Sequence, residues 1–381
     1  MASRFVLRAS SQVLRSVAGA PIRTSTPACK TVAAAASFHT TRTLRDDNST
    51  NNKKPSSPHP GSFARTDDNI TVEYPEEGQL PASKPVTGRG GDHMKRTLAS
   101  FSLEGKTGVV TGGARGLGLV MGQGMVISGA NLAIVDMNSE SPRCTPIIVC
   151  FSFVLVAEEA ERQAALLIDL YRRENPGASR VPKVTAHYAD VSDADSVHEC
   201  TQSIIAEHGK IDNLVTSAGF TENYDAINYP IDRMRKLWNV NVDGTYLFAI
   251  NVAKHLMERK AAGSMVFIGS MSGSIVNVPQ PQAPYNAAKA AVRHMAASLA
   301  VEWAHAGIRV NCISPGYMLT ALTEKILDDN PDLKRQWTSL IPQGKMGLPV
   351  DLMGPVAFLL SDASLYVTGA DLRVDGGYTV T

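Results

Sequence analysis

A tyrosine and a lysine stand four residues apart in the segment APYNAAKAAV, at Tyr285 and Lys289. Residues at this spacing share one face of a helix. A free tyrosine has a pKa near ~10 and is a poor base at neutral pH, but a neighbouring ammonium group stabilises the phenolate and lowers that pKa. The pair could therefore act as a proton acceptor. A helix beside a hydrophobic core often carries the same two residues without a catalytic role, so the pair needs support from other motifs.

A serine precedes this helix at the end of an apolar segment, SMVFIGS, which runs from Ser264 to Ser270. The segment predicts a strand, because it is short, apolar and followed by polar and small residues. Such a strand would carry Ser270 to the carboxyl edge of a sheet, next to the helix that holds the tyrosine and the lysine.

A glycine-rich turn follows the first strong folding signal, LEGKTGVVTGGARGLG, which predicts a strand, a turn and the start of a helix. The glycines at 112, 116 and 118 would let backbone N–H groups approach a pyrophosphate, and the positive end of the helix favours the same charge. A glycine pattern alone is weak support, because it often marks only a turn.

An acidic residue ends the next predicted strand, NLAIVD, at Asp136, 18 residues after Gly118. This spacing is close to that at which a carboxylate binds the adenosine ribose hydroxyls. Asp136 would also repel a 2′-phosphate, which favours NAD over NADP. Arg115 argues the other way, because a basic residue in the loop can accept that phosphate. We give the acid more weight and predict NAD.

Further strands alternate with helical segments along the chain. The segment VTAHYADVSD predicts a strand that leads to Asp190, and IDNLVTSAG predicts another that ends in small residues. This alternation is typical of an α/β protein with a doubly wound, Rossmann-type parallel sheet in a single catalytic domain. A cofactor would lie across the carboxyl ends of those strands.

These motifs together resemble the classical short-chain dehydrogenase/reductase family. The resemblance covers about residues 101–381 and is carried by TGGARGLG, the strand-ending Ser270, the Tyr285-x-x-x-Lys289 pair, RVNCISPGY and VDGG. It implies that Tyr285 is the general base, and that Lys289 lowers its pKa and binds the nicotinamide ribose. It further implies that Ser270 hydrogen-bonds the substrate oxygen, and that Asn241 positions a water next to the lysine.

Two serines compete for the role of substrate donor. The commonest serine-to-tyrosine spacing in the family is 13, which fits Ser272. Ser270 instead fits the family pattern S-x-x-G through Gly273, with two extra residues before the tyrosine, and is the preferred assignment. The resemblance also implies cofactor-binding positions, namely Gly112, Arg115, Gly116, Leu117, Gly118, Asp136, Asp190, Val191, Ala218, Gly219, Tyr285, Lys289, Pro315 and Gly316.

Within the family, IGSMSGSIVN, PQPQ, YNAAKA and YVTGADLRVDGG resemble the fungal polyol dehydrogenases. The resemblance implies a homotetramer that uses NAD to interconvert a sugar alcohol and a ketose, with D-arabinitol and D-ribulose as the expected pair. Other small-molecule substrates remain open, among them mannitol, sorbitol, xylulose and a mitochondrial 3-oxoacyl thioester. Substrate choice should lie in a mobile lid at residues 316–346. A regulator that binds NAD without catalysis would be expected to lack Tyr285, Lys289 or Ser270.

The cysteine spacing argues against a metalloprotein, and the charge balance argues against a nucleic-acid-binding protein. The five cysteines form no CxxC pair and have no histidine partners at zinc-site spacing, so no metal site is predicted. Residues 1–45 hold 7 of the 37 Lys and Arg and no acid, which leaves 30 basic against 36 acidic residues in the remainder. A mildly acidic body does not favour nucleic-acid binding.

The amino-terminal 100 residues differ from the rest. Residues 1–45 are basic, free of acids and rich in Ser, Thr and Ala, which is typical of a mitochondrial transit peptide. A disordered basic tail on a cytoplasmic enzyme is the alternative. Residues 46–100 are rich in Asp, Asn, Ser and Pro and predict a disordered linker or arm.

The chain departs from the family pattern in two places. It has TSAG, from Thr216 to Gly219, where the family usually has N-x-A-G. Residues 139–157 form an anomalous insertion between the strand with Asp136 and a helix predicted at residues 158–175. Its apolar run is far shorter than the ~20 residues that span a bilayer and is prone to β-structure. Our hypothesis is a translated intron or gene-model error, which the transcript sequence would test.

Overall fold

The computed structural model describes residues 97–137 and 150–381. The predicted transit peptide, most of the predicted arm and residues 139–149 of the insertion lie outside the described residues. The last residues of the predicted arm belong to the folded part, because a short 3-10 helix, η2 (Thr97–Phe101), precedes the first strand.

In the described residues, one seven-stranded sheet forms the centre, with the order β3-β2-β1-β4-β5-β6-β7 and parallel pairing throughout. The predicted doubly wound α/β fold is therefore confirmed. The strand order reverses direction between β1 and β4. In such sheets, ligands bind outside the carboxyl ends of the strands at this switch point. The strands are β1 (Thr107–Thr111), β2 (Asn131–Asp136), β3 (Val184–Tyr188), β4 (Asn213–Thr216), β5 (Gly263–Ile268), β6 (Ile308–Pro315) and β7 (Asp371–Val374).

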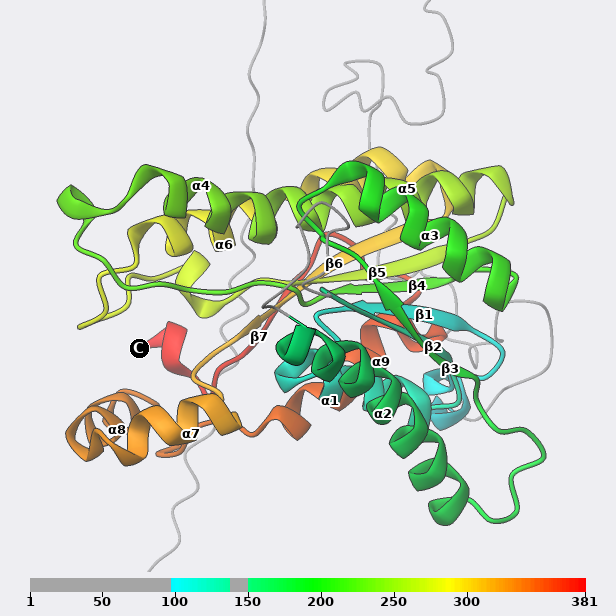
Figure 1. Ribbon diagram of the computed structural model, residues 1–381, viewed down its shortest axis with the longest axis horizontal. Coiled ribbons are helices and arrows are strands. Elements are labelled where there is room, and N and C mark those ends of the chain that lie inside the picture. Colours follow the sequence, from blue (N-terminus) through cyan, green and yellow to red (C-terminus); the bar gives the residue numbers. More distant parts are fainter. Residues whose placement is uncertain (1–96, 138–149) are drawn as a thin grey trace, which may run out of the picture. The chain divides into compact units, whose positions relative to one another are not determined.

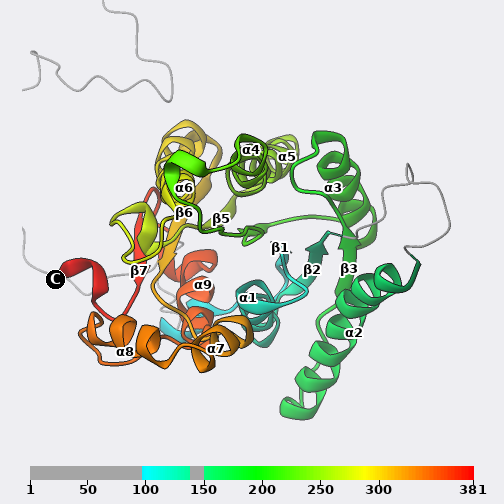
Figure 2. The ribbon, with the colours of Figure 1, turned by 60° about the vertical axis from the view of Figure 1, so that its left-hand side comes forward.

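Helices cover both faces of the sheet (Figures 1 and 2). One face carries α3, α4, α5 and α6, and the other carries α1, α2 and α9, while α7 and α8 form a separate pair beside β7. The bounds are α1 (Gly116–Ile127), α2 (Cys150–Glu174), α3 (Ala194–His208), α4 (Ile231–Trp238), α5 (Gly244–Glu258), α6 (Ala283–Trp303), α7 (Ala321–Asp328), α8 (Pro331–Ser339) and α9 (Met353–Leu360).

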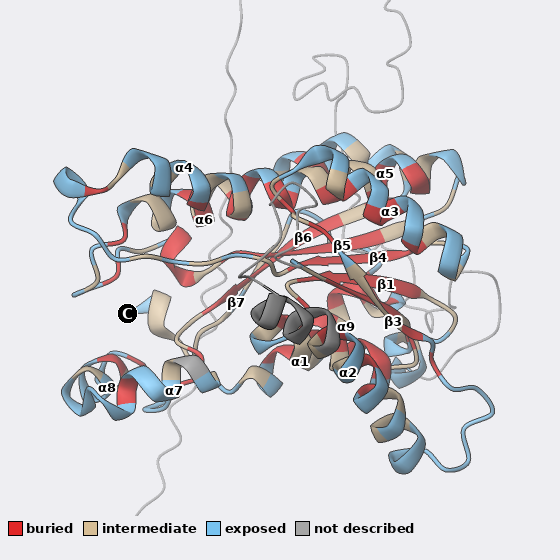
Figure 3. Cartoon of the chain, in the orientation of Figure 1, coloured by how far each residue is buried: buried red, intermediate tan, exposed pale blue. Residues whose placement is uncertain are grey.

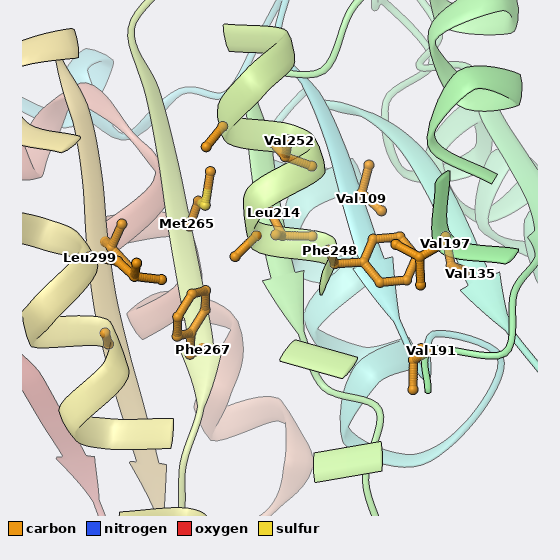
Figure 4. Close-up of a cluster of buried hydrophobic side chains, with 14 of the residues drawn as sticks. Val109, Val135, Val191, Val197, Leu214, Phe248, Val252, Met265, Phe267 and Leu299 are labelled. Atoms are coloured by element: carbon orange, nitrogen blue, oxygen red, sulfur yellow. The ribbon is translucent and has the colours of Figure 1, made fainter. Parts of the chain in front are cut away.

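The hydrophobic core lies in two layers, one on each face of the sheet. All five residues of β1 are buried, and two consecutive residues of this strand, Val109 and Val110, belong to different layers. Figure 3 shows the buried strands, and Figure 4 shows the layer in which Phe248 of α5 packs near Leu214. A sheet covered on both faces requires such continuous apolar strands. The core thereby fixes the carboxyl ends of β1, β4 and β5 relative to one another.

The helix after the insertion begins earlier than the sequence predicted. Helix α2 begins at Cys150, so the end of the insertion, residues 150–157, forms the first turns of this helix rather than an extended segment. The sequence had placed the start of the helix at residue 158. The hypothesis of a translated intron or gene-model error stays a prediction.

Candidate active site

Tyr285 and Lys289 lie near the start of α6, where Pro284 occupies the first turn. Proline fits this position because the first N–H groups of a helix have no partner within the helix. Lys289 is 7% exposed, and its Nζ donates a 2.9 Å hydrogen bond to the main-chain carbonyl of Ile268 at the end of β5. The same Nζ lies 5.7 Å from the centre of the Tyr285 ring. The structure therefore brings the predicted base and its lysine to the carboxyl edge of the sheet.

Burial controls the pKa values of this pair. It raises the pKa of Tyr285 above its usual value, while the neighbouring Ser270 side chain opposes the shift. It lowers the pKa of Lys289 to about 8, with the Cys312 thiol acting in the opposite direction. In the protein chain alone, the pKa of Tyr285 is thus raised rather than lowered as the sequence predicted. The physical reason is that burial disfavours the charged phenolate more than the Ser270 hydrogen bond favours it.

The serines at the end of β5 form a hydrogen-bonded pair. Ser270 caps the 3-10 helix η5 (Met271–Gly273), and its Oγ accepts from Ser272 N at 3.1 Å. Its Oγ also lies 3.0 Å from Ser272 Oγ. Ser272 is 5% exposed. Burial raises the pKa of the Tyr285 phenol, and it is the hydrogen bond of the Ser270 side chain that acts in the opposite direction. This geometry agrees with the preference for Ser270 as substrate donor, with Ser272 behind it.

Gly273 allows η5 to pack directly on the catalytic helix. A Cβ at this position would come within 2.8 Å of the main chain of Lys289 and Ala290. No side chain fits there without moving η5 away from α6. The glycine of the S-x-x-G pattern therefore sets the distance between Ser270 and Tyr285.

Asn241 lies in a π-turn, η4 (Asn239–Asp243), between α4 and α5. Such turns within helices are frequent at functional sites. Its Nδ2 donates to the carbonyls of Phe220 and Leu237, both at 3.0 Å, while its buried Oδ1 has no hydrogen-bond partner in the described part of the chain. A Cβ placed on Gly219 would lie 2.5 Å from this Oδ1 and 3.6 Å from Lys289 Nζ. Asn241 thus presents a free acceptor beside the lysine, as its predicted role requires.

The glycine-rich turn has the close approaches that a phosphate loop requires. Gly112 has a φ of +64°, and a Cβ there would come within 2.9 Å of the main chain of Ala218. A Cβ at Gly118 would lie 2.1 Å from the carbonyl oxygen of Gly112. Gly116, by contrast, faces open space at the start of α1. The turn therefore fits a nicotinamide dinucleotide, with Gly116 and the helix end available to its pyrophosphate.

The Asp136 carboxylate stands next to this loop. Its Oδ2 accepts from Ala114 N at 2.9 Å and its Oδ1 from Met137 N at 2.8 Å. Two backbone donors thus fix the carboxylate at the position expected for ribose recognition and leave each oxygen further lone pairs. Arg115 is exposed at the N-cap of α1.

The remaining predicted cofactor positions line the same edge of the sheet. Asp190 lies two residues beyond β3, and its Oδ1 accepts from Ser192 N and Oγ. Val191 packs against Gly244, where a Cβ would be 2.7 Å away. Pro315 ends β6, and Gly316 approaches Asp375 equally closely. Leu117 lies in the first turn of α1.

Sequence reasoning missed a residue that anchors the turn after β4. Thr111 Oγ1 accepts from Ser217 N at 3.1 Å and from Ala218 N at 3.2 Å, and so holds the turn after β4 against β1. Thr216 Oγ1, in contrast, is buried and has no hydrogen-bond partner among the described residues. The only sequence signal for this contact is that Thr111 ends the strand before the glycine loop.

A stability measurement tests the environment of the lysine. We expect Lys289→Met to abolish turnover and to raise the free energy of unfolding at pH 7 by about 1–3 kcal/mol, because a charge no longer has to be buried. Above pH 8 the folded wild type loses this proton, whereas the unfolded chain keeps it up to about pH 10.5, so the wild type gains stability as the pH rises. The difference should therefore shrink between pH 8 and 10.5. Denaturant unfolding across this range measures it, and a difference independent of pH would contradict the buried ammonium.

Comparisons with known proteins agree with this geometry. A family model described as enoyl-(acyl carrier protein) reductase matches residues 154–379. Ribulose-forming D-arabinitol 2-dehydrogenase of Candida tropicalis is 37% identical over 285 residues, which are 74% of this chain and 95% of the relative. NADH-dependent L-xylulose reductase of Ambrosiozyma monospora is 36% identical over 289 residues, which are 75% and 99% of the two chains.

A solved structure is similar over the same region. Gluconate 5-dehydrogenase from Burkholderia cenocepacia J2315, in complex with NADP and tartrate, aligns with a TM-score of 0.63 and 30% identity, and covers 75% of this chain and 100% of its own. Together with the Ser270, Tyr285 and Lys289 constellation at the carboxyl edge of the sheet, these similarities show that the chain belongs to the short-chain dehydrogenase/reductase family of nicotinamide-dependent oxidoreductases.

Proposed function

We propose that this protein is an NAD-dependent polyol dehydrogenase that interconverts D-arabinitol and D-ribulose. The observation that carries the proposal is the convergence of Ser270, Tyr285 and Lys289 at one point, beside a glycine loop that holds Asp136. Relatives that act on D-arabinitol and L-xylulose support a sugar alcohol and a ketose as the substrate pair.

The side chains divide the chemistry of alcohol oxidation among them. Tyr285 Oη takes the proton from the substrate hydroxyl as its carbon loses a hydride, for which a bound oxidised nicotinamide supplies the acceptor. Ser270 donates a hydrogen bond to the same oxygen and stabilises the negative charge that develops on it. Lys289, fixed by the Ile268 carbonyl, places a positive charge beside the phenolate. In ketone reduction, Tyr285 returns the proton to the oxygen.

Asp136 supports NAD as the preferred cofactor. Two backbone N–H groups hold its carboxylate beside the glycine loop, and a carboxylate at the adenosine ribose would repel a 2′-phosphate. Arg115 is an exposed residue of the same loop, and its charge would partly offset this repulsion. The NADH-dependent relative agrees with this proposal, whereas the NADP in the related gluconate dehydrogenase shows that the fold accommodates either cofactor.

The segment after β6, which we propose as the substrate lid, has a packed apolar interior. Helices α7 and α8 enclose a small cluster of Leu327, Trp337, Ile341 and Met346. Tyr317 stacks on Trp337 with ring centres 4.2 Å apart and an interplanar angle of 8°. Amide side chains face the Tyr317 hydroxyl from the loop before α6, which gives this side of the site the polar groups that a hydroxyl-rich substrate needs.

We further propose that the enzyme is imported into mitochondria and works as a homotetramer. The support for import is the run of basic residues without an acid up to Arg45. Fusion of residues 1–45 to a fluorescent protein should direct it to mitochondria, and replacement of Arg4, Arg8 and Arg15 by Glu should leave it in the cytosol. Diffuse fluorescence of the unaltered fusion would favour a cytoplasmic enzyme.

Within residues 97–137 and 150–381, no helix is both long and apolar enough to cross a bilayer.

A substrate panel tests the proposed reaction. We expect NAD reduction to be fastest with D-arabinitol, slower with mannitol, sorbitol and xylitol, and weaker for each with NADP. Ketose reduction by NADH should show the same order, and 3-oxoacyl thioesters should react poorly. Preference for a 3-oxoacyl thioester would support the fatty-acyl alternative, preference for NADP would contradict the role given to Asp136, and binding of NAD without turnover would favour a regulator.

A further inference from the structure

The segment PQPQ before the catalytic helix contains a buried glutamine with no role in the reaction as described so far. Gln282 is 6% exposed and is the N-cap of α6, where its main-chain oxygen accepts from Tyr285 N at 3.0 Å. Any residue could supply this main-chain bond. The side chain of Gln282 is therefore the feature that requires an explanation.

The side-chain amide of Gln282 stands among three acceptors. Its Nε2 lies 2.8 Å from Asn277 Oδ1, 2.9 Å from Asn286 Oδ1 and 3.4 Å from Ser272 Oγ. An amide nitrogen has two hydrogens, so it cannot serve three acceptors fully at once. The long bond to Ser272 consequently depends on how firmly the two asparagines hold the amide.

The first branch of this network leads to the reacting groups. Ser272 Oγ lies 3.0 Å from Ser270 Oγ, and Ser272 N donates to the same atom. Ser270 in turn acts on the Tyr285 phenol. Gln282 is thus separated by one hydroxyl from the serine that contacts the substrate oxygen.

The second branch leads to the lid. Asn277, which is 4% exposed, donates from Nδ2 to the Tyr317 hydroxyl at 3.3 Å. Gln280 also exchanges hydrogen bonds with this hydroxyl at 3.4 Å. The Tyr317 ring stacks on Trp337 in the lid cluster and meets Tyr378 edge-on. A change in the position of Tyr317 would therefore move Asn277. The Gln282 amide would then share its two hydrogens differently between Asn277 and Ser272.

We propose that Gln282 is a positioning residue that holds the Ser270–Ser272 pair at Tyr285 and couples it, through Asn277 and Tyr317, to the lid. This inference rests on the proposed function, because it assigns Ser270 to the substrate oxygen. Closure of the lid on a polyol would then align the catalytic serine at the same time. Buried polar networks of this kind act as units, since the loss of one member leaves its partners unsatisfied.

The test compares Gln282→Met, which keeps the length of the side chain without its hydrogen bonds, with Gln202→Met, a matched change on the exposed face of α3. We expect Gln282→Met to lower kcat for polyol oxidation about 10- to 100-fold, with little change in KM for NAD, because a small displacement of a catalytic donor has effects of this size. The pH at which oxidation is half-maximal should also rise, since Ser270 opposes the raised pKa of Tyr285. Gln202→Met should match the wild type.

A double-mutant cycle tests the coupling to the lid. Tyr317→Phe should lower kcat in the wild-type background and have little further effect in the Gln282→Met background, because both changes interrupt one path. Fully additive effects would remove the link to the lid. An unchanged kcat and pH midpoint in Gln282→Met would overturn the inference itself.

A spectroscopic measurement separates failure of this inference from failure of the proposed function. In protein labelled with ¹³C at the tyrosine ζ carbons, the Tyr285 signal, assigned with Tyr285→Phe, reports its contact with Ser270 without any substrate. We expect Gln282→Met to shift this signal toward its position in Ser270→Ala, and an unshifted signal would contradict the inference even if no polyol is oxidised. If Gln282→Met does not fold, Gln282→Asn, with its shorter reach, provides the same comparison.

Discussion

The hydrogen bond from the buried Lys289 ammonium to the Ile268 carbonyl is the contact on which the site depends. It joins the catalytic helix α6 to the last residue of β5, and it gives a partner to a charge that would otherwise be buried alone. Gly273 makes the contact possible, because η5 can then lie directly on the main chain of α6. Ser270 and Tyr285 are each only a few residues from this junction, so their separation follows from it.

The sheet supplies the second constraint. Parallel pairing places the carboxyl ends of all seven strands along one edge, and the switch between β1 and β4 opens that edge to a dinucleotide. The glycine loop, Asp136 and the turn after β4 therefore meet near α6, although they are far apart in the sequence. The polar Thr107 and Thr111 are buried as well, because β1 is an inner strand of a sheet that helices cover on both faces.

The fold was largely predictable from the sequence, as was the meeting of the candidate catalytic residues at one edge of the sheet, because both depend on local patterns. Strand and helix periodicity predicted the α/β sheet, and the four-residue spacing, together with the glycine loop, Asp136 and Ser270, pointed to Tyr285 and Lys289. The direction of the Tyr285 pKa shift was not predictable, because it depends on burial rather than on the lysine alone. The contacts of Thr111, the π-turn at Asn241 and the network of Gln282 were also missed, since each joins residues whose proximity only the folded chain establishes.

The central claim is that the Tyr285 hydroxyl transfers the proton and contributes little to the affinity for the cofactor. Comparison of wild type with Tyr285→Phe tests it directly, by measuring polyol oxidation and NADH binding in the same preparations. We predict that the variant loses at least about 100-fold in the rate of polyol oxidation, while the Kd for NADH stays within about threefold of that of the wild type. Turnover at a rate near that of the wild type, with NADH still bound, would contradict it.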